Sequence, residues 1–250
     1  MNKPVPVVPV DTHANQLKDH VYLITGATGG LGRETAIALA KFGASVILTG
    51  RNEKKLEALY DEICLAGYPT PALIPFDLAQ TDEDIYQQLI QSIYNEFNRL
   101  DGLVHVACEI GIVGPIGSQD AAVWQKVIQT NVNSAAILSK VCLPLLHQAQ
   151  HASISFVSDS SARQSHAYWG AYGVSKVAIE SFAKTLADEL DSSHVVSNVF
   201  IPGPCILPIR KKTHPGEEDS SLSTTGWVAK NLVDVILSKK SGVFVTPSTA

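Results

Sequence analysis

Tyr172 and Lys176 are the residues of this chain whose types and spacing are best suited to proton chemistry. They are four positions apart, so on a helix they share one face. A nearby ammonium group stabilises the tyrosinate and lowers the pKa of the phenol from its reference value of about 10. A tyrosine tuned in this way passes a proton to or from a reacting oxygen. A Tyr-x-x-x-Lys spacing also arises by chance, so the elements around it decide its meaning.

A glycine-rich turn near the start of the chain is suited to binding an anion. The apolar run 21–25 leads directly into residues 26–32 (GATGGLG), and a helical pattern follows. Glycines let the backbone approach a pyrophosphate, and free N–H groups at a helix N-terminus hold it. The spacing differs from the usual G-x-G-x-x-G, and a glycine turn can also serve tight packing, but the strand–turn–helix context favours a dinucleotide. The predicted contacts in this turn are Gly26, Thr28, Gly30, Leu31 and Gly32.

The ends of the next two predicted strands carry side chains that bear on which dinucleotide binds. Arg51 follows the second strand, and no acidic residue is present there to hydrogen-bond a ribose 2′-hydroxyl. Its guanidinium is placed to hold a 2′-phosphate, which favours NADP over NAD; the alternative is a solvated surface arginine. Asp77 and Leu78 follow the third strand. There the carboxylate either binds the adenine amino group or serves as an N-cap or turn residue.

Strand-like and helix-like segments alternate along the chain from residue 18 onward. The strand-like runs are short, apolar on successive residues and rich in Val, Ile and Leu, as expected for strands buried on both faces. The alternation predicts one α/β domain with a doubly wound, parallel, seven-stranded sheet and helices on both faces. The predicted strands are residues 21–25, 45–49, 72–76, 102–107, 153–157, 195–200 and 243–246, and the predicted helices are 31–42, 53–65, 82–97, 121–146 and 171–190.

The composition argues against several other classes of function. The 250 residues are 45% hydrophobic and 17% charged with a formal net charge of −5, which is typical of a globular protein and indicates no nucleic-acid partner. No apolar run reaches the roughly 18–20 residues that span a bilayer, so we expect no membrane association. The four cysteines are widely spaced and match no metal pattern. We therefore expect no metal, and reduced thiols in a cytoplasmic protein.

Two segments lie outside the alternating pattern. Residues 1–15 contain repeated prolines and no long apolar core, so they predict an extended or disordered tail and not a signal peptide. Residues 214–225 are polar and lie between the sixth and seventh predicted strands. They indicate either a solvated surface loop or a mobile lid over a site, and residues 204–225 are the candidate substrate loop.

Together these motifs resemble the short-chain dehydrogenase/reductase family, over residues 16–250. The chain also resembles a bacterial, YciK-like subgroup of that family in the runs 50–56 (GRNEKKL), 131–133 (NVN) and 169–172 (WGAY). The resemblance implies a single Rossmann-type domain and an NADP-dependent dehydrogenase or reductase. It further implies a small-molecule carbonyl or alcohol substrate and assembly as a homodimer or homotetramer.

The resemblance implies roles for individual residues. The family residues that match Tyr172 and Lys176 are the proton donor and its partner, and the lysine also holds the nicotinamide ribose. Asn131 matches an asparagine that breaks a helix and anchors a water on the proton relay, although on sequence alone it could be an ordinary polar helix residue. The cofactor contacts named above are completed by Ala107, Tyr172, Lys176, Pro202 and Gly203.

The chain departs from the family at the position of its catalytic serine. Thirteen residues before Tyr172 the sequence has Asp159, flanked by Ser158 and Ser160. Alternate strand residues face opposite sides, so the carboxylate faces the site unless a slip or bulge brings Ser158 or Ser160 there. An ionised Asp159 cannot donate a hydrogen bond and would raise the pKa of Tyr172. A protonated Asp159 could donate one in dry surroundings.

Further departures near the site leave two hypotheses open. The family's Asn-Asn-Ala-Gly stands here as HVAC at residues 105–108, where His105 is expected to be structural, and Leu207 replaces a threonine that binds the nicotinamide carboxamide. The first hypothesis is an oxidoreductase in which Asp159 is an altered polariser. The second is a protein that binds the nucleotide and has lost efficient turnover. Retention of Asn131, Tyr172 and Lys176 favours the first.

Overall fold

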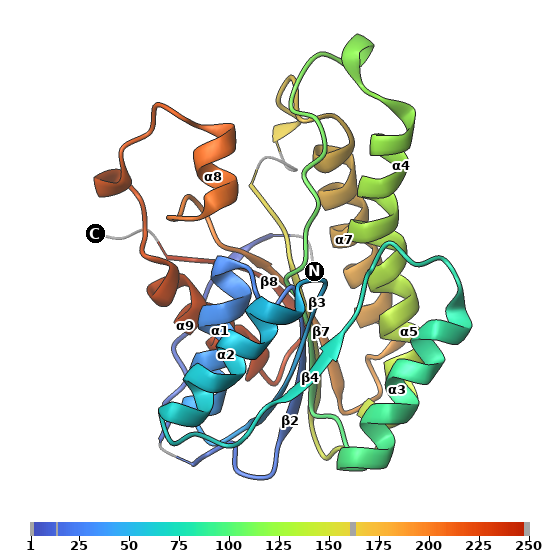
Figure 1. Ribbon diagram of the computed structural model, residues 1–250, viewed down its shortest axis with the longest axis vertical. Helices are drawn as coiled ribbons and strands as arrows, with labels where there is room; N and C mark the ends of the chain where they lie inside the picture. Colours follow the sequence, from blue (N-terminus) through green and yellow to red (C-terminus); the bar gives the residue numbers. More distant parts are fainter. Residues whose placement is uncertain (1–2, 14, 161–163, 248–250) are drawn as a thin grey trace.

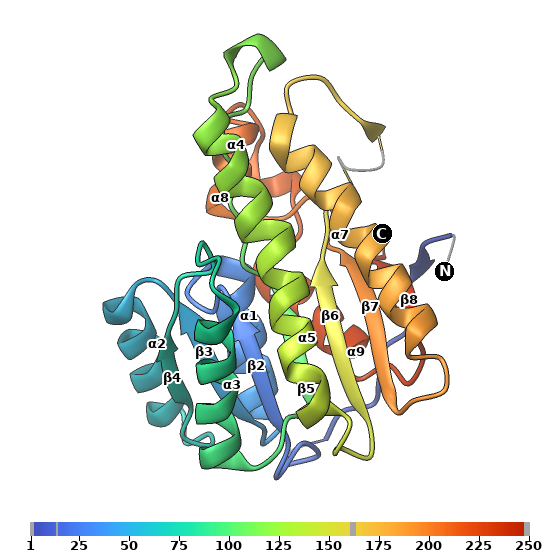
Figure 2. The same ribbon diagram turned by 90° about the vertical axis from the view of Figure 1, so that its right-hand side faces the viewer.

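A parallel β-sheet crosses the middle of the molecule. The computed structural model of the protein describes residues 3–13, 15–160 and 164–247. The sheet has eight strands in the order β1-β8-β7-β6-β5-β2-β3-β4, and every pairing is parallel (Figures 1 and 2). The strands are β1 (Val5–Pro6), β2 (Val21–Thr25), β3 (Ser45–Gly50), β4 (Ala72–Pro75), β5 (Gly102–His105), β6 (Ala152–Val157), β7 (Val195–Ile201) and β8 (Gly242–Val245).

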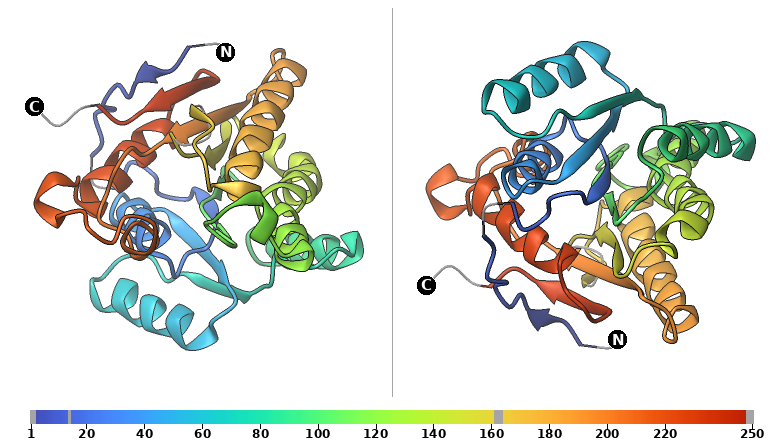
Figure 3. Two further views of the ribbon diagram at one scale, coloured as in Figure 1. Left: turned by 90° about the horizontal axis from the view of Figure 1, so that it is seen from above. Right: turned by 90° about the horizontal axis from the view of Figure 1, so that it is seen from below.

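Helices cover both faces of this sheet (Figures 2 and 3). On one face lie α1 (Gly30–Lys41), α2 (Glu53–Leu65) and α9 (Thr225–Ile236), and on the other lie α3 (Glu83–Phe97), α5 (Ser134–Leu146) and α7 (Gly170–Glu189). Successive residues of β2 show why the strands read as continuous apolar runs. Leu23 packs into the cluster under α3, α5 and α7, whereas Ile24 packs under α1 and α9, and both are fully buried.

The prediction of a doubly wound parallel sheet is confirmed, with one strand more than the seven predicted. The extra strand, β1, comes from the proline-rich tail and pairs with the edge strand β8. Val7 continues this pairing, since its N–H donates to the carbonyl of Val245 at 3.0 Å, and its side chain is buried. Prolines weaken the sequence signal for a strand, but they are tolerated at the edge of a sheet.

The predicted helix 121–146 is interrupted. The chain instead forms α4 (Ala121–Ile128), a π-helical turn (Gln129–Asn133) and then α5. The family resemblance implied a broken helix at Asn131, and the π-helical turn lies at that position. Four further elements were not predicted: the 3₁₀ turns Ile116–Ser118 and Asp219–Ser221, α8 (Pro208–Thr213), and α9, which begins at the N-cap Thr224.

The strand order places a crevice at the carboxyl end of β2. From β2 the chain moves outward to β3 and β4, and then returns to β5 on the other side of β2. The loops that leave β2 and β5 therefore diverge, and ligands of such sheets bind between them. Within the described ranges, no helix is long and apolar enough to cross a membrane. The same residues contain no cluster of His, Cys, Asp or Glu suited to a metal ion.

Candidate active site

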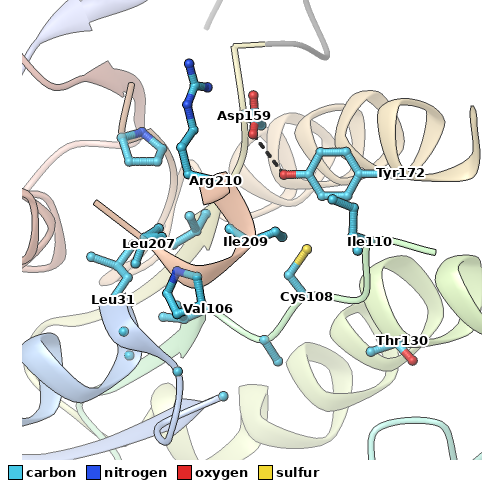
Figure 4. A pocket seen from close by; sticks show the side chains of 18 of the residues that line it. Leu31, Val106, Cys108, Ile110, Thr130, Asp159, Tyr172, Leu207, Ile209 and Arg210 are labelled. Atoms are coloured by element: carbon cyan, nitrogen blue, oxygen red, sulfur yellow. Dashed lines mark hydrogen bonds between the residues drawn. The ribbon is translucent and has the colours of Figure 1, made fainter. Parts of the chain in front are cut away.

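A cavity of about 390 Å³ opens at the carboxyl ends of the central strands, between the glycine turn, α7 and α8 (Figure 4). It brings together every residue that the sequence analysis assigned to the cofactor, and their individual roles stay predictions. Three of the four predicted catalytic residues, Asp159, Tyr172 and Lys176, also line it. The predicted cofactor residues on its wall are Gly26, Thr28, Gly30, Leu31, Gly32, Arg51, Asp77, Leu78, Ala107, Pro202 and Gly203.

The glycine turn is a backbone cradle at the start of α1. Gly26 has φ +66°, and a Cβ there would lie 2.7 Å from the Cα of Ala107. A Cβ on Gly32 would lie 2.3 Å from the carbonyl oxygen of Gly26. Gly29 caps α1 without a side-chain hydrogen bond, and no acidic residue lies in the first helical turn. An anion can therefore approach the first N–H groups of α1 directly.

Arg51 and Asp77 lie at the mouth of the cavity. Arg51 is 59% exposed, and its Nη2 lies 4.0 Å from Oε2 of Glu109, which is also 4.0 Å from Nζ of Lys126. Glu109 and Lys126 were not predicted from the sequence, in which the available signal was a carboxylate directly after Cys108. Asp77 accepts a hydrogen bond from the N–H of Ala79 at 3.0 Å, so it has the alternative role of a turn residue as well as a place on the cavity wall.

Asp159 faces the cavity and contacts Tyr172. The Tyr172 hydroxyl donates to Oδ2 of Asp159 at 2.9 Å (Figure 4). Ser158 points the other way, into the protein, where its hydroxyl donates to Glu180 at 2.7 Å. Strand alternation is therefore kept through this segment. Ser160 is exposed at the edge of the cavity.

Lys176 does not act on the Tyr172 hydroxyl in this structure as its spacing predicts. Its Nζ donates to the carbonyl oxygen of Val157 at 2.9 Å and lies 5.4 Å from the centre of the Tyr172 ring. Burial raises the pKa of Tyr172 well above its usual value, and Cys108 and Asp159 raise it further. The expectation that Lys176 lowers this pKa is wrong for this arrangement, because the phenol is only 5% exposed and its nearest charge is negative.

Asn131 holds two segments behind the site in place. It lies on the π-helical turn, where its Nδ2 donates to the carbonyl of Glu109 at 2.8 Å and to the Ser175 hydroxyl at 2.9 Å. Its Oδ1 accepts from the N–H of Glu109 at 2.7 Å. Asn131 and Lys176 both line a second, small cavity of about 10 Å³. The structure thus places Asn131 behind the lysine and away from the main cavity wall.

His105 is structural, as expected from the sequence. Its Nε2 lies 3.1 Å from the Ser139 hydroxyl, and its ring stacks on Phe156. Burial lowers the pKa of His105 to about 3. Thr25, at the end of β2, links this strand to the loop after β5 and was not predicted from the sequence to do so. Its hydroxyl accepts from the N–H groups of Val106 and Ala107, both at 3.2 Å.

The candidate substrate loop closes one side of the cavity. Its two ends are joined, since Ile206 N–H donates to Ser223 at 3.0 Å and the Thr225 hydroxyl donates to Ile206. Leu207 lies against the glycine turn, and a Cβ on Gly30 would be 2.7 Å from its Cδ2. Beyond it, Arg210 on α8 is held by Glu217 through two hydrogen bonds of 2.6 and 2.7 Å.

Two cysteines with raised pKa values line the cavity, Cys108 half-buried and Cys205 buried. Both Cys108 and Cys205 are free. Burial raises the pKa of Cys108, and it raises the pKa of Cys205 to about 11. A raised pKa favours the protonated thiol, which is a weaker nucleophile than the thiolate.

The fold and the cavity define a dehydrogenase of the short-chain type, and comparison with known proteins agrees. The family model for short chain dehydrogenases matches residues 20–218. The chain belongs to this family. It is 40% identical over 208 residues to the oxidoreductase YciK of Escherichia coli K12, covering 83% of this chain and 82% of that one.

Solved structures of similar proteins carry cofactors. A short chain dehydrogenase of Shigella flexneri 2a in complex with NADP is 36% identical, with a TM-score of 0.88 over 94% of this chain and 99% of that one. One from Escherichia coli CFT073 in complex with NADPH is also 36% identical, with a TM-score of 0.89 over 93% of this chain and 98% of that one.

Proposed function

We propose that the protein is an NADP-dependent oxidoreductase that transfers hydride between the nicotinamide and a carbonyl or alcohol substrate. The observation that carries this proposal is one cavity that joins the glycine cradle to Tyr172 and Lys176. The cradle fits a pyrophosphate, because Gly26 and Gly32 have no room for a side chain and α1 begins without a capping group. When bound, the cofactor accepts or delivers the hydride.

The protein's own residues supply recognition and proton transfer. Arg51 is the guanidinium at the position suited to a 2′-phosphate, and similar proteins have been solved with NADP and NADPH. Tyr172 exchanges the proton with the substrate oxygen, and Lys176 holds the ribose. Asn131 keeps Ser175 and the loop at Glu109 in place beside them.

A second candidate function is nucleotide binding without efficient turnover. One observation favours it: the hydroxyl that should donate to a substrate carbonyl donates to Asp159 instead. Titration with NADPH and NADH, followed by a panel of alcohols and carbonyls, separates the two functions. Turnover that is lost in Tyr172→Phe supports the enzyme, whereas binding of NADPH without turnover supports the alternative.

The choice of cofactor is tested at Arg51. We expect Arg51→Ala to weaken NADPH binding by about 10- to 100-fold and to leave NADH binding nearly unchanged, because only NADPH has a phosphate for the guanidinium. Arg33→Ala is the matched control, since Arg33 pairs with Glu34 and Glu62 away from the cavity. Isothermal titration measures both cofactors, and equal weakening of the two by Arg51→Ala would contradict phosphate recognition.

We also propose that the protein is a cytoplasmic homodimer or homotetramer. Val174 and Val177 support the assembly into dimers or tetramers, because both lie on α7 and are half exposed. Light scattering of Val174→Asp beside the unaltered protein tests it. A smaller mass for the variant is expected if this face of α7 joins two copies.

A further inference from the structure

The Tyr172 hydroxyl has one proton, and that proton is engaged. It points at Oδ2 of Asp159, 2.9 Å away, and a hydrogen bond to a carboxylate is stronger than one to a neutral carbonyl. Toward the cavity, the phenol oxygen therefore presents lone pairs and no donor. A ketone or aldehyde oxygen also offers only acceptors. An alcohol has its own O–H, which can donate to the phenol oxygen.

Burial also disfavours the ionised form of Tyr172, which is the form that could act as a base by itself. Its ring is 5% exposed, and burial raises its pKa well above the usual value, with Cys108 and Asp159 adding to the effect. The ammonium of Lys176 donates one hydrogen bond to the carbonyl of Val157 and lies 5.4 Å from the centre of the Tyr172 ring. A tyrosinate would thus be a largely buried anion in contact with a carboxylate. A route in which the phenol receives one proton while it gives up another avoids that charge.

We propose that Asp159 is the terminal proton acceptor for alcohol oxidation, with Tyr172 passing the proton between substrate and carboxylate. This rests on the proposed function, because the oxidised cofactor takes the hydride. The hydride leaves the carbinol carbon with its electron pair, and the O–H pair becomes the second bond of the new carbonyl. The substrate proton goes to Oη of Tyr172, and the proton that Tyr172 held goes to Oδ2 of Asp159.

The surroundings of Asp159 suit this role. It is half-buried, and the next residue, Ser160, is exposed, so a protonated Asp159 is close to water. A carboxylate accepts several hydrogen bonds at once, so other donors leave its contact with Tyr172 in place. The ionisable groups that face the pair are Lys176 on α7, Cys108 in the loop after β5 and Cys205 in the loop after β7. Arg210 faces it from α8 (Figure 4).

The cavity wall narrows the class of alcohol. Trp169 lies 5.4 Å from the Tyr172 ring, between ring centres, and Ile110 and Ile209 lie around the same phenol (Figure 4). The apolar wall favours a hydrophobic secondary alcohol over a sugar or a polyol. 1-Phenylethanol and its ketone, acetophenone, are a matched pair of probes for the two directions.

The test compares Asp159→Asn with the unaltered protein. The amide oxygen still accepts the hydrogen bond of Tyr172 but cannot take up its proton. We expect the variant to bind NADP⁺ normally and to oxidise 1-phenylethanol about 100-fold more slowly at neutral pH. Its remaining activity should rise with pH into the alkaline range, because tyrosinate must then form. The unaltered protein should lose activity only toward acid pH. Asp188→Asn, an exposed substitution on α7, is the matched control.

Asp159→Ser tests whether a hydroxyl can replace the carboxylate. A serine hydroxyl can donate to a carbonyl oxygen but cannot take up the proton of Tyr172 as a carboxylate does, so we expect slower oxidation of 1-phenylethanol at neutral pH. Because the equilibrium is unchanged, kcat/KM for reduction of acetophenone with NADPH should fall by the same factor at the same pH. Equal oxidation by the Asn variant at every pH would overturn the relay. So would an unaltered protein that binds NADP⁺ but oxidises neither 1-phenylethanol nor other apolar secondary alcohols.

A measurement without substrate separates the relay from the proposed function. The ultraviolet absorbance of tyrosinate is titrated in the unaltered protein and in Asp159→Asn, each against its Tyr172→Phe counterpart. Loss of the carboxylate should let Tyr172 ionise at a lower pH, and an unchanged titration would overturn the contact. Failure to bind either pyridine nucleotide, alongside the expected titration shift, would reject the oxidoreductase and leave the Asp159–Tyr172 contact established.

Discussion

At the scale of single residues, burial governs ionisation in this site more than neighbouring charges do. Burial is the largest cause of the shifted pKa of Tyr172, His105 and Cys108 alike. The spacing of Tyr172 and Lys176 predicts an ammonium that acidifies the phenol, but spacing contains no information on how deeply the phenol is buried or where the ammonium donates. Asp159 matters for the same reason, since a carboxylate is a stronger acceptor where water is scarce.

His105 gives a pH dependence of stability whose sign can be worked out. Burial lowers its pKa from 6.5 to about 3 in the folded protein. Between these values the unfolded chain binds one proton more than the folded chain, so the free energy of unfolding falls as the pH falls. Between about pH 6.5 and about pH 5, we expect the free energy of unfolding of the unaltered protein to fall by about 2 kcal/mol more than that of His105→Asn.

Urea unfolding at several pH values measures this difference. Comparing pH dependences, and not absolute stabilities, removes any packing cost of the substitution. His13→Gln is the control, because the His13 side chain is 74% exposed. Parallel stability curves for the unaltered protein and His105→Asn would contradict a buried, neutral imidazole.

At the scale of elements, two glycines of one helical turn have different reasons to be glycine. A Cβ on Gly32 would meet a backbone oxygen, that of Gly26, at 2.3 Å, whereas a Cβ on Gly30 would meet the flexible end of Leu207 at 2.7 Å. We expect Gly32→Ala to lower the melting temperature by roughly 10 °C, against a few degrees for Gly30→Ala.

The partner residue makes the test of the two glycines specific. Adding Leu207→Ala removes the side chain that a methyl group at position 30 would contact. It should therefore restore most of the melting temperature lost in Gly30→Ala. It should restore none of the melting temperature lost in Gly32→Ala, because the atom contacted there is the backbone oxygen of Gly26. Calorimetry without cofactor measures all four proteins, and equal recovery in both backgrounds would contradict this account of the turn.

The elements also show where prediction from sequence succeeds and where it fails. Helix α2 begins and ends where it was predicted, and in the structure the Asn52 side chain caps it by accepting from the N–H of Lys55. The expected helix 121–146 runs across the π-helical turn at Gln129–Asn133, and only the family resemblance at Asn131 indicated a break there. In the site, the glycine turn and Tyr172 carry local signals. Glu109 and Thr25 act through contacts with distant strands and helices, which no local pattern encodes.

At the scale of the whole molecule, the tail completes the sheet. Without β1, the edge of β8 would present unpaired N–H and C=O groups, and such edges are templates for pairing with other chains. The tail covers this edge and ends the sheet with prolines at positions 4, 6 and 9, which cannot donate to a further strand. A hydrogen bond from the N–H of Val10 to Oδ1 of Asp234, at 3.1 Å, also holds the tail against α9.

Two adjacent valines test whether the tail stabilises the fold. Val7 is 4% exposed and packs into the cluster under α1 and α9, whereas Val8 is 74% exposed. We expect Val7→Ala to lower the free energy of unfolding by about 1.5 kcal/mol, and Val8→Ala to leave it nearly unchanged, because only Val7 loses buried methyl groups. Denaturant unfolding measures both. Equal stabilities would mean that the tail is not packed in solution, and removal of residues 1–10 should then neither destabilise the domain nor increase its self-association.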